Sequence, residues 1–292
     1  MHLLDDFGPI VRQAEPLAPH TWFQLGGAAE FFAEPRDADE LACLLRRCRE
    51  EEMPVRLLGG GSNVLVRDEG VPGVVIHLSA PEFAKIEVHG QLVTAGGGAK
   101  LGHVISSSVR EGLAGLETLV GIPGTIGGAL HGNAGSRGGD VGQWTSRATI
   151  MTASGEVVER TRDELVFAYR QSSLDELVIL FAEFHFDRED PDELTKRMQQ
   201  QWIVKKASQP LAHQSAGCIF KNPRGMSAGM LIEQAGLKGT RVGGAEVSDR
   251  HANFIVAEPG ASSQDVLRLI ELVRSRVADR LTVELELEIE VW

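Results

Sequence analysis

Two glycine-rich clusters constrain the fold of this chain more than any other feature. The first, Gly59-Gly60-Gly61-Ser62-Asn63, lies between the apolar runs Val55–Leu58 and Val64–Val66, which we interpret as strands. Glycine has no Cβ, so it adopts positive φ angles and lets backbone N–H groups approach an anion closely. The cluster matches neither the GxGxxG fingerprint nor the GxxxxGK[ST] loop. It is therefore either a phosphate-binding loop or a plain turn between strands.

The second cluster runs from Gly121 to Ala129 and continues through His131–Gly135. It is too long, and in places too apolar, for a simple linker. We predict that the whole region 121–142 is loop-like. A large flat ligand resting on it and a loop packed between domains are equally compatible with the pattern.

The rest of the chain alternates between helical and extended patterns. Helical spacing predicts helices over 37–48, 99–112, 192–206 and 262–281, two of them opened by capping-box sequences. Extended patterns predict hairpins over 85–94 and 148–159 and strands over 74–78 and 178–186. Apolar residues alternate with glutamates over 283–291, which predicts one strand with one buried face. The fold class is α+β or mixed α/β.

Charge and length limit the classes of partner. The 292 residues are 42% hydrophobic, which suits two or three compact units, and the net charge is −12. This acidity argues against nucleic acid or an anionic membrane as the main partner. Residues 201–250, however, hold seven Lys and Arg against three Asp and Glu. An anionic ligand is therefore expected to meet this local basic segment.

The N-terminal segment and the cysteines indicate the compartment. The opening residues lack the basic leader and unbroken apolar core of a secretory signal, and no later stretch reaches the roughly 20 apolar residues of a membrane span. Cys43, Cys48 and Cys218 form no CxxC pair and no disulfide framework. We expect a cytoplasmic chain with no metal site and no membrane partner.

Several motifs in order resemble the UDP-N-acetylenolpyruvoylglucosamine reductase family, also called UDP-N-acetylmuramate dehydrogenases. The resemblance covers nearly the whole chain, through Pro54–Asn63, Gly121–Gly135, Phe167–Ser172, Ser215–Pro223, Leu231–Gly239, Gly243–Ala245 and His251–Val256. The moderate length and the lack of a tyrosine-bearing insertion resemble the shorter of the family's two types.

The resemblance implies an α+β chain with a two-subdomain FAD-binding module of the vanillyl-alcohol-oxidase type and a C-terminal α+β substrate-binding domain. We expect domains at 1–80, 81–200 and 201–292, with the terminal strand 282–292 able to return to the FAD module. Both glycine clusters become FAD contacts. The implied cofactor-binding residues are Gly59, Gly60, Gly61, Ser62, Asn63, Gly121, Pro123, Gly124, Thr125, Gly127, Gly128 and Asn133.

The implied reaction uses NADPH to reduce the enolpyruvyl group of UDP-N-acetylglucosamine enolpyruvate, giving UDP-N-acetylmuramate for peptidoglycan. NADPH reduces the flavin and leaves, and the reduced flavin gives hydride to the terminal enolpyruvyl carbon. Negative charge then develops on an enolate-like species that needs cationic or hydrogen-bonding partners. By resemblance, Arg170 and Glu288 supply them. The family's usual proline before the glutamate is Leu287 here, so Glu286 and Glu290 remain alternatives.

Cys218 stands where the family commonly has a serine that donates the proton to the adjacent carbon. A thiol, with a pKa of about 8.5, is a better acid than an aliphatic hydroxyl, so the departure is chemically tolerable. The alternative is a small buried apolar cysteine. We favour the proton donor.

Binding of the UDP-sugar is implied for Tyr169, Lys221, Asn222 and His251. The diphosphate has basic candidates in Lys205, Lys206, Lys221, Arg224, Lys238, Arg241 and Arg250. The resemblance also implies a monomer.

Two other functions fit parts of the sequence. A flavin oxidase or dehydrogenase of the same architecture keeps the glycine clusters but has no need of the Cys218–Asn222 motif. A non-catalytic nucleotide-sugar sensor keeps the fold without flavin or NADPH turnover, and the intact set of Arg170, Cys218 and Glu288 argues against it.

Overall fold

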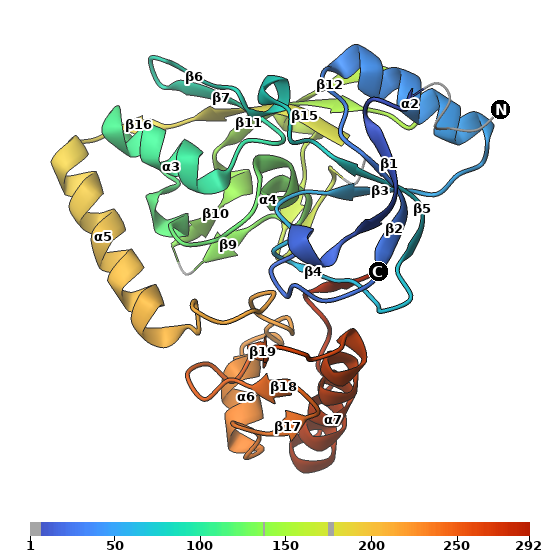
Figure 1. Ribbon diagram of the computed structural model, residues 1–292. Helices are drawn as coiled ribbons and strands as arrows, with labels where there is room; N and C mark the ends of the chain where they lie inside the picture. The colour runs from blue at the N-terminus through green and yellow to red at the C-terminus, as the bar shows by residue number, and fades with distance from the viewer. Residues whose placement is uncertain (1–6, 137, 175–177) are drawn as a thin grey trace. The chain divides into compact units, whose positions relative to one another are not determined.

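The computed structural model describes residues 7–136, 138–174 and 178–292, and chain contacts divide it into two compact units (Figure 1). The first comprises the described residues of Met1–Gln13, Glu30–Gly60 and Pro72–Ile203. The second comprises Ala14–Ala29, Gly61–Val71 and Val204–Trp292. No helix in the described ranges is long and apolar enough to cross a membrane.

Two sheets form the framework that the first unit is built on. One is four-stranded with order β1-β2-β5-β3, and the other is antiparallel and five-stranded with order β12-β11-β15-β7-β6. The strands of the first sheet are β1 (Val11–Pro16), β2 (Ala28–Ala33), β3 (Val55–Leu58) and β5 (Val71–His77). Those of the second are β6 (Ile86–His89), β7 (Leu92–Gly96), β11 (Thr145–Met151), β12 (Val157–Thr161) and β15 (Val178–His185).

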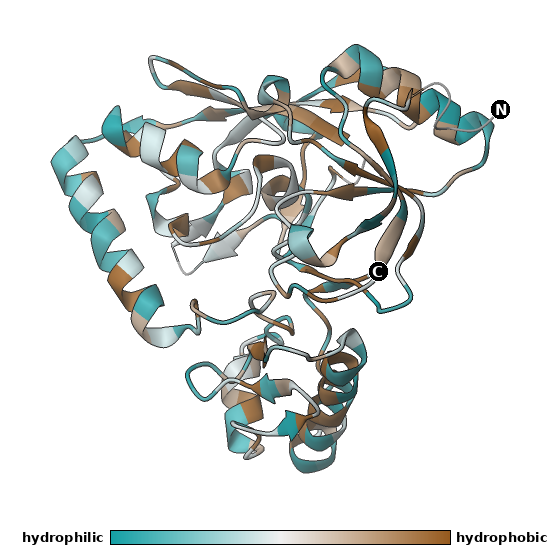
Figure 2. Cartoon of the chain, in the orientation of Figure 1, coloured by the Kyte–Doolittle hydropathy of each residue, from teal (hydrophilic) through white to brown (hydrophobic). Residues whose placement is uncertain are grey.

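Each sheet buries one core against helices. Helix α2 (Ala38–Glu50) starts at Asp37, whose side chain accepts the Glu40 N–H, and contributes Leu41, Leu44 and Leu45 to a core shared with β2 and β5. Helices α3 (Leu101–Arg110) and α4 (Ile126–His131) pack their apolar residues in the core of the five-stranded sheet. Figure 2 shows α2 and α3 with both brown apolar and teal polar residues.

Short elements complete the first unit. They are the strands β8 (Leu113–Ala114), β9 (Gly135–Ser136), β10 (Gly139–Asp140), β13 (Phe167–Ala168), β14 (Gln171–Ser172) and β16 (Asp187–Arg188). The 3-10 helices of its described residues are η2 (Pro81–Ala84), η3 (Glu117–Leu119), η4 (Val141–Gln143) and η5 (Arg162–Glu164), and η1 (Ala18–His20) lies in the second unit.

The second unit packs two helices on a small sheet. Strands β17 (Arg241–Val242), β18 (Ala245–Val247) and β19 (Ile255–Ala257) are antiparallel, and α6 (Ala228–Gln234) and α7 (Ser263–Leu281) share one core with them. The pair β4 (Val64–Leu65) and β20 (Glu290–Val291) is parallel, and Leu65 joins the same core. Residues from both ends of the sequence therefore build this unit.

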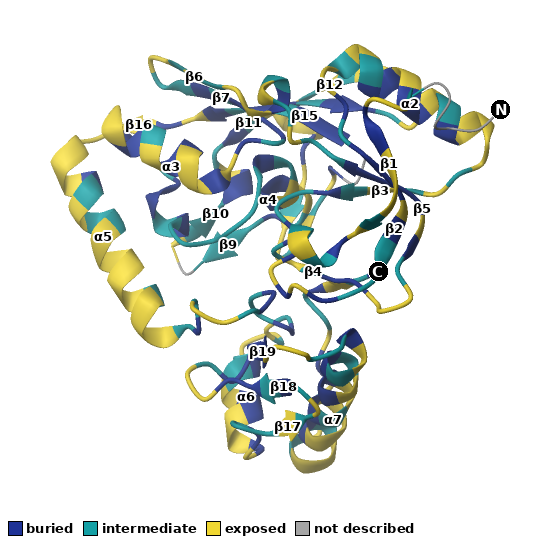
Figure 3. Ribbon diagram, in the orientation of Figure 1, coloured by how far each residue is buried: buried dark blue, intermediate teal, exposed yellow. Residues whose placement is uncertain are grey.

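Helix α5 (Pro191–Ser208) is mostly exposed along its length, as its largely yellow ribbon in Figure 3 shows. Among its residues, all of which are described, Leu194 alone is buried. Ile203 and Val204 near its C-terminal end are exposed apolar side chains.

The predictions based on strong periodicity are confirmed. The structure has helices α2, α3, α5 and α7 at the predicted places, with a capping box at Ser262 opening α7. The two predicted hairpins are β6–β7 and β11–β12, and the strand over 178–186 is β15.

The prediction that residues 121–142 are loop-like is wrong, because the region contains α4, the β9–β10 pair and η4. Gly127 and Gly128 are poor helix formers. Tertiary contacts offset this: Ile126 and Leu130 are fully buried, and the Gly127 N–H donates to the Gly97 carbonyl at 2.8 Å.

The prediction of one continuous strand over 283–291 is also wrong. Leu287 forms an isolated bridge with Phe220, and only Glu290–Val291 forms a strand, with β4 as its partner. The alternation of exposure is nevertheless present, since Leu285 and Ile289 are buried while Glu284, Glu286 and Glu290 are exposed. Alternation predicts which face is buried, but the pairing partner changes partway along the segment.

Candidate active site

The first glycine cluster leaves the end of β3, where Leu58 pairs with His77 of the parallel strand β5. A Cβ on Gly60 would lie 2.8 Å from the Cα of Gly124, and a Cβ on Gly59 would lie 2.8 Å from the Thr125 hydroxyl oxygen. The first two glycines of the first cluster thus pack against Gly124 and Thr125 of the second, although 64 residues separate Gly60 from Gly124 in the sequence.

The second half of the first cluster belongs to the second unit. Gly61 has φ +62°, and its carbonyl accepts the Trp22 N–H at 2.9 Å. Ser62 is partly exposed and Asn63 is exposed. The Asn63 side-chain amide donates to the Glu288 carbonyl at 3.0 Å.

Thr125 is the N-cap residue of α4 and follows the loop Gly121–Gly124 of the second cluster. Its hydroxyl accepts the Gly128 N–H at 3.4 Å, and the Gly124 carbonyl accepts the Leu101 N–H at 3.1 Å. Gly121, Pro123, Gly124 and Thr125 are partly exposed, as is Gly127, and Gly128 is exposed. The cluster therefore presents accessible backbone with little side chain over it.

These observations fit the FAD that the sequence implies. Close backbone approach and missing Cβ atoms are what a dinucleotide phosphate needs from a binding loop. Gly59, Gly60, Gly124 and Thr125 pack closely together within one unit, and all four are partly exposed, so they provide such a surface.

A third glycine run, Gly96-Gly97-Gly98, was not singled out from the sequence. A Cβ on Gly97 would lie 1.9 Å from the Ile179 carbonyl oxygen, and the Gly97 carbonyl receives the Gly127 N–H. The run brings the second cluster against the end of β7. Three consecutive glycines at the end of a strand are the signal that would have identified it.

Asn133 holds the turn that carries Arg170. The Asn133 side chain is buried, donates to the Ala168 carbonyl at 2.8 Å and accepts the Gly142 N–H at 3.1 Å. Ala168 precedes Tyr169 and Arg170, which form the two-residue turn between β13 and β14. The described contacts of Asn133, predicted to bind the cofactor, are therefore those of a support for this turn.

Arg170 has φ +56°, a left-handed conformation that costs a non-glycine residue about 1 kcal/mol or more. Its guanidinium donates to the Gly135 carbonyl at 3.2 Å and lies 5.5 Å from the centre of the Tyr169 ring. Tyr169 is 53% exposed. Strain at a candidate catalytic residue, held by surrounding contacts, is typical of functional sites.

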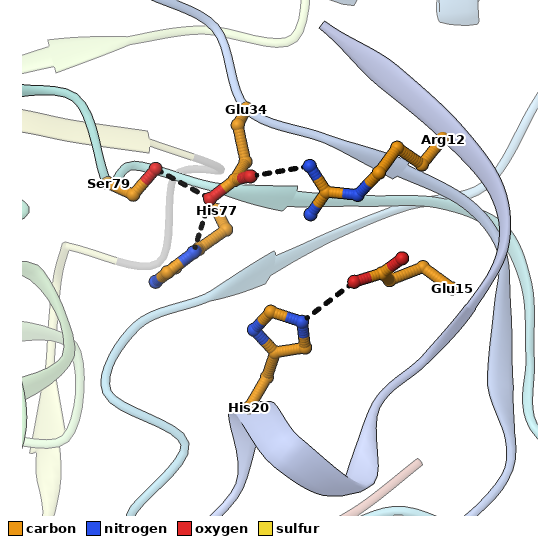
Figure 4. Close-up of polar contacts among 6 residues, drawn as sticks. All are labelled: Arg12, Glu15, His20, Glu34, His77 and Ser79. Atoms are coloured by element: carbon orange, nitrogen blue, oxygen red, sulfur yellow. Dashed lines mark hydrogen bonds and ion pairs between the residues drawn. The ribbon is translucent and has the colours of Figure 1, made fainter.

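A polar cluster at the end of β5 was also missed (Figure 4). Glu34 accepts hydrogen bonds from Ser79 at 2.7 Å and Arg12 at 2.9 Å, and is 3.2 Å from His77. Burial is the largest single influence and raises the pKa of Glu34, but these three partners together lower it below its ordinary value. In the second unit, His20 contacts Glu15 at 3.2 Å. Because His77 pairs with Leu58, the Glu34 cluster lies beside the start of the first glycine cluster.

Cys218 and Glu288 lie on two backbone segments that pair in the second unit. The Glu288 N–H donates to the Ile219 carbonyl at 2.8 Å, and the Lys221 N–H donates to the Glu286 carbonyl at 2.9 Å. Cys218, which directly precedes Ile219, is partly exposed. Residues 70 positions apart are thereby brought into one structure.

The described contacts distinguish the three glutamates that the sequence left open. Glu288 is partly buried, whereas Glu286 is 81% exposed and lies 3.8 Å from the Lys221 ammonium. Glu290 is exposed and contacts the Trp292 indole N–H. Glu288, the residue chosen by resemblance, is thus the least exposed of the three.

The remaining predicted substrate residues also lie in the second unit. The Asn222 side chain accepts the Ala228 N–H at 2.9 Å at the start of α6. The His251 ring packs edge-on against Phe254, and its Nδ1 accepts the Asn253 N–H at 3.3 Å. Burial lowers the pKa of His251, so the neutral form with the proton on Nε2 is favoured at neutral pH.

Several basic candidates for the diphosphate are paired with carboxylates. Lys238 contacts Glu233 at 2.9 Å, and Arg241 contacts both Glu246 and Glu258. Arg224 and Arg250 are exposed. Arg170 belongs to the first unit, whereas Cys218, Lys221, Asn222, His251 and Glu288 belong to the second.

Comparison with known families assigns both parts of the chain. Residues 29–161 match the model of an FAD binding domain, and residues 209–292 match the model of the UDP-N-acetylenolpyruvoylglucosamine reductase C-terminal domain. The predicted fold class, an α+β chain with an FAD-binding module followed by a substrate-binding domain, is confirmed.

Whole-chain relatives agree with this assignment. UDP-N-acetylenolpyruvoylglucosamine reductase 2 of Symbiobacterium thermophilum is 45% identical over 97% of this chain and 92% of its own length. The Heliobacterium modesticaldum reductase is 42% identical over 98% and 92%. The crystal structure of the Thermus caldophilus reductase superposes with a TM-score of 0.82 at 37% identity, covering 97% of this chain and 99% of that one. The chain therefore belongs to the UDP-N-acetylenolpyruvoylglucosamine reductase family.

Proposed function

We propose that Arg170, Cys218 and Glu288 carry the chemistry of the family's reaction in this chain. The chain is an FAD-dependent oxidoreductase that reduces UDP-N-acetylglucosamine enolpyruvate with NADPH, giving UDP-N-acetylmuramate for peptidoglycan synthesis. The observation that carries the residue assignment is the 2.8 Å hydrogen bond from the Glu288 N–H to the Ile219 carbonyl, next to Cys218.

The two glycine clusters hold the cofactor in this proposal. Gly59, Gly60, Gly124 and Thr125 present closely opposed backbone, and Ser62 and Asn63 continue the first loop. When bound, FAD supplies hydride transfer between NADPH and the terminal carbon of the enolpyruvyl group.

Each of the three residues then has a distinct task. Arg170 provides a fixed positive charge for the enolate-like charge that develops on the substrate carboxylate. Cys218 gives its thiol proton to the carbon next to the ether oxygen and recovers a proton from solvent. Glu288 is the second polar partner that the resemblance implies for this developing charge.

Substrate binding is assigned to Tyr169, Lys221, Asn222 and His251. Lys221 is an ammonium in the segment that carries Cys218, and it suits an anionic oxygen of the substrate. His251, favoured in its neutral form, presents an Nε2–H donor. We further propose that the chain is monomeric and works in the reducing cytoplasm, which agrees with its three cysteines being thiols.

An anaerobic absorbance titration tests the proposal. NADPH should bleach the oxidised flavin, and the enolpyruvyl substrate should restore it. In Arg170→Ala the first step should proceed and the second should be lost. Equal loss of both steps would remove Arg170 from the assignment, and reduction without reoxidation in the unaltered protein would indicate a different flavoenzyme.

A further inference from the structure

Asn253 is buried, and the two polar groups of its side chain and the two of its backbone all form hydrogen bonds within the second unit. Only 2% of the residue is exposed. Its side-chain oxygen accepts the Phe220 N–H at 3.0 Å, and its side-chain nitrogen donates to the Phe220 carbonyl at 2.8 Å. Its backbone carbonyl accepts the Ile219 N–H at 2.8 Å, and its backbone N–H donates to His251 Nδ1 at 3.3 Å.

The Asn253 side chain therefore pairs with the backbone of Phe220 as an adjacent β-strand would. The Ile219 carbonyl and the Lys221 N–H face the Glu286–Glu288 segment. The N–H and carbonyl of Phe220 face the opposite edge, where Asn253 satisfies both. The segment that carries Cys218 is thus held by the backbone of Glu288 on one edge. It is also held by Asn253, through its side chain and its backbone carbonyl, and Cys218 itself forms an isolated bridge with Phe254.

The buried setting makes this support hard to replace. Phe220 is 1% exposed, so water cannot easily take over its two backbone bonds if the amide is removed. A buried backbone group without a partner carries a desolvation penalty, so the segment shifts to find one. Such a shift moves Cys218 on one side and Glu288 on the other.

We propose that Asn253 is a positioning residue for the reaction, which fixes Cys218 and Glu288 relative to each other by holding both backbone groups of Phe220. This proposal rests on the proposed function, in which Cys218 and Glu288 take part in the reaction. Asn253 itself touches neither the reacting atoms nor the hydride path in this proposal.

The chemistry of the amide explains why other side chains do not serve. Aspartate has the same shape but presents a carboxylate oxygen to the Phe220 carbonyl, where a donor is needed. It should regain part of the contact at low pH, when a protonated carboxyl can donate. Alanine provides neither bond at any pH.

Alkylation of the Cys218 thiol tests the positioning without depending on turnover. The background is Cys43→Ser, because Cys43 is exposed; Cys48 is buried and burial raises its pKa to about 11, so it reacts slowly. We expect Asn253→Ala to change the alkylation rate of Cys218 several-fold and to shift its pH profile, and Asn253→Asp to approach the parent rate as the pH falls. An unchanged rate and profile in folded Asn253→Ala would overturn the proposal.

The half-reactions provide the second test. Asn253→Ala should slow flavin reoxidation by the enolpyruvyl substrate about 10- to 100-fold, the usual effect of a small misplacement, while flavin reduction by NADPH is retained. Val273→Ala, a core change in α7, is the matched control for lost stability and should slow neither step selectively.

These measurements separate the two proposals. If Cys218→Ala reoxidises normally, the proposed role of Cys218 fails, whatever the Asn253 variants do. If Cys218→Ala fails and Asn253→Ala reoxidises at the parent rate, only the positioning role is refuted. If Asn253→Ala does not fold, Asn253→Asp must show the pH-dependent recovery, and a flat response would refute it.

Discussion

The side-chain amide of Asn63 donates a 3.0 Å hydrogen bond to the backbone carbonyl of Glu288, across 225 residues of sequence. The Asn63 carbonyl also accepts the Glu290 N–H at 2.9 Å. Asn63 thus belongs to the first glycine cluster and at the same time anchors the segment that carries a proposed catalytic residue. We therefore expect a change in the first glycine cluster to alter the position of the segment that carries Glu288.

Asn63→Ala should separate these two tasks. We expect it to lower the free energy of unfolding by about 0.5–1.5 kcal/mol, the net value of one hydrogen bond, and to slow flavin reoxidation by the enolpyruvyl substrate. Urea unfolding and stopped-flow absorbance measure the two effects. Gln214→Ala loses an exposed hydrogen bond to Gln24 and serves as control. Normal reoxidation in Asn63→Ala would show that the anchor is dispensable.

Cys218 should tolerate serine better than alanine. Cys218→Ser keeps a proton on the side chain and should stay active with an altered pH dependence, whereas Cys218→Ala should slow reoxidation by about 10²- to 10⁴-fold, the contribution of a general acid. NADPH should reduce the flavin at the parent rate in both. Comparable activity of the serine and alanine variants would contradict the role of proton donor.

Glu288 and Glu286 provide a matched pair on one segment. Glu288→Ala should slow reoxidation strongly, and Glu288→Gln should fall between it and the parent, because the amide donates a hydrogen bond but no acidic proton. Glu286→Ala loses only a contact with Lys221 from an 81% exposed side chain, so its effect should be small. The rate of flavin reoxidation in a single turnover, measured for each variant, decides between the two glutamates. A larger effect at Glu286 would mean that the catalytic register is displaced by two residues.

Gly60 and Gly102 should respond in opposite ways to a methyl group. Gly60→Ala places a Cβ 2.8 Å from the Gly124 Cα, so we expect lost FAD and a lower Tm. Gly102 lies on α3 with open space around it, so Gly102→Ala should raise the free energy of unfolding by about 0.5–1 kcal/mol and keep the flavin. Flavin content measures FAD binding, and thermal unfolding measures stability. Full FAD retention in Gly60→Ala would argue against an FAD site shared by the two glycine clusters.

The Glu34 cluster should stabilise the protein at neutral pH and lose this effect in acid. Burial raises the pKa of Glu34, but Ser79, Arg12 and His77 together lower it below its ordinary value of 4.5. The unfolded state therefore binds more protons in acid, so the stabilisation is present above about pH 4.5 and is lost as the pH falls through the lower folded-state pKa. The difference in unfolding free energy between the parent and Glu34→Gln should stay constant from about pH 7 to about pH 5 and shrink as the pH falls below about 4.5. The exposed Glu69→Gln is the control.

Elements with strong local signals were predictable from the sequence. Helix α7 has Ser262 as its cap and Val266, Leu269 and Val273 at helical spacing, and the structure buries these apolar residues. Helix α4 was missed because its stability comes from the core and from Gly97, a partner about 30 residues away, which no local pattern reveals.

The candidate site shows the same division. Resemblance pointed to Arg170, Cys218 and Glu288, the residues proposed to carry the chemistry, but the residues that hold them depend on pairing between distant segments. Asn253 bonds to Phe220 and Asn133 bonds to Ala168, more than 30 residues away in each case. An asparagine in sequence gives no sign of whether its amide faces water or another backbone.

The divided pairing of residues 283–291 has a consequence for biosynthesis. Phe220 and Leu65 are made long before Leu287 and Val291, the residues they pair with. If the domain folds during synthesis, Phe220 and Leu65 stay unpaired until Leu287 and Val291 have been made. Glu288 is made together with these partners, so a nascent chain that already buries much of its core still lacks one residue of the proposed reaction centre.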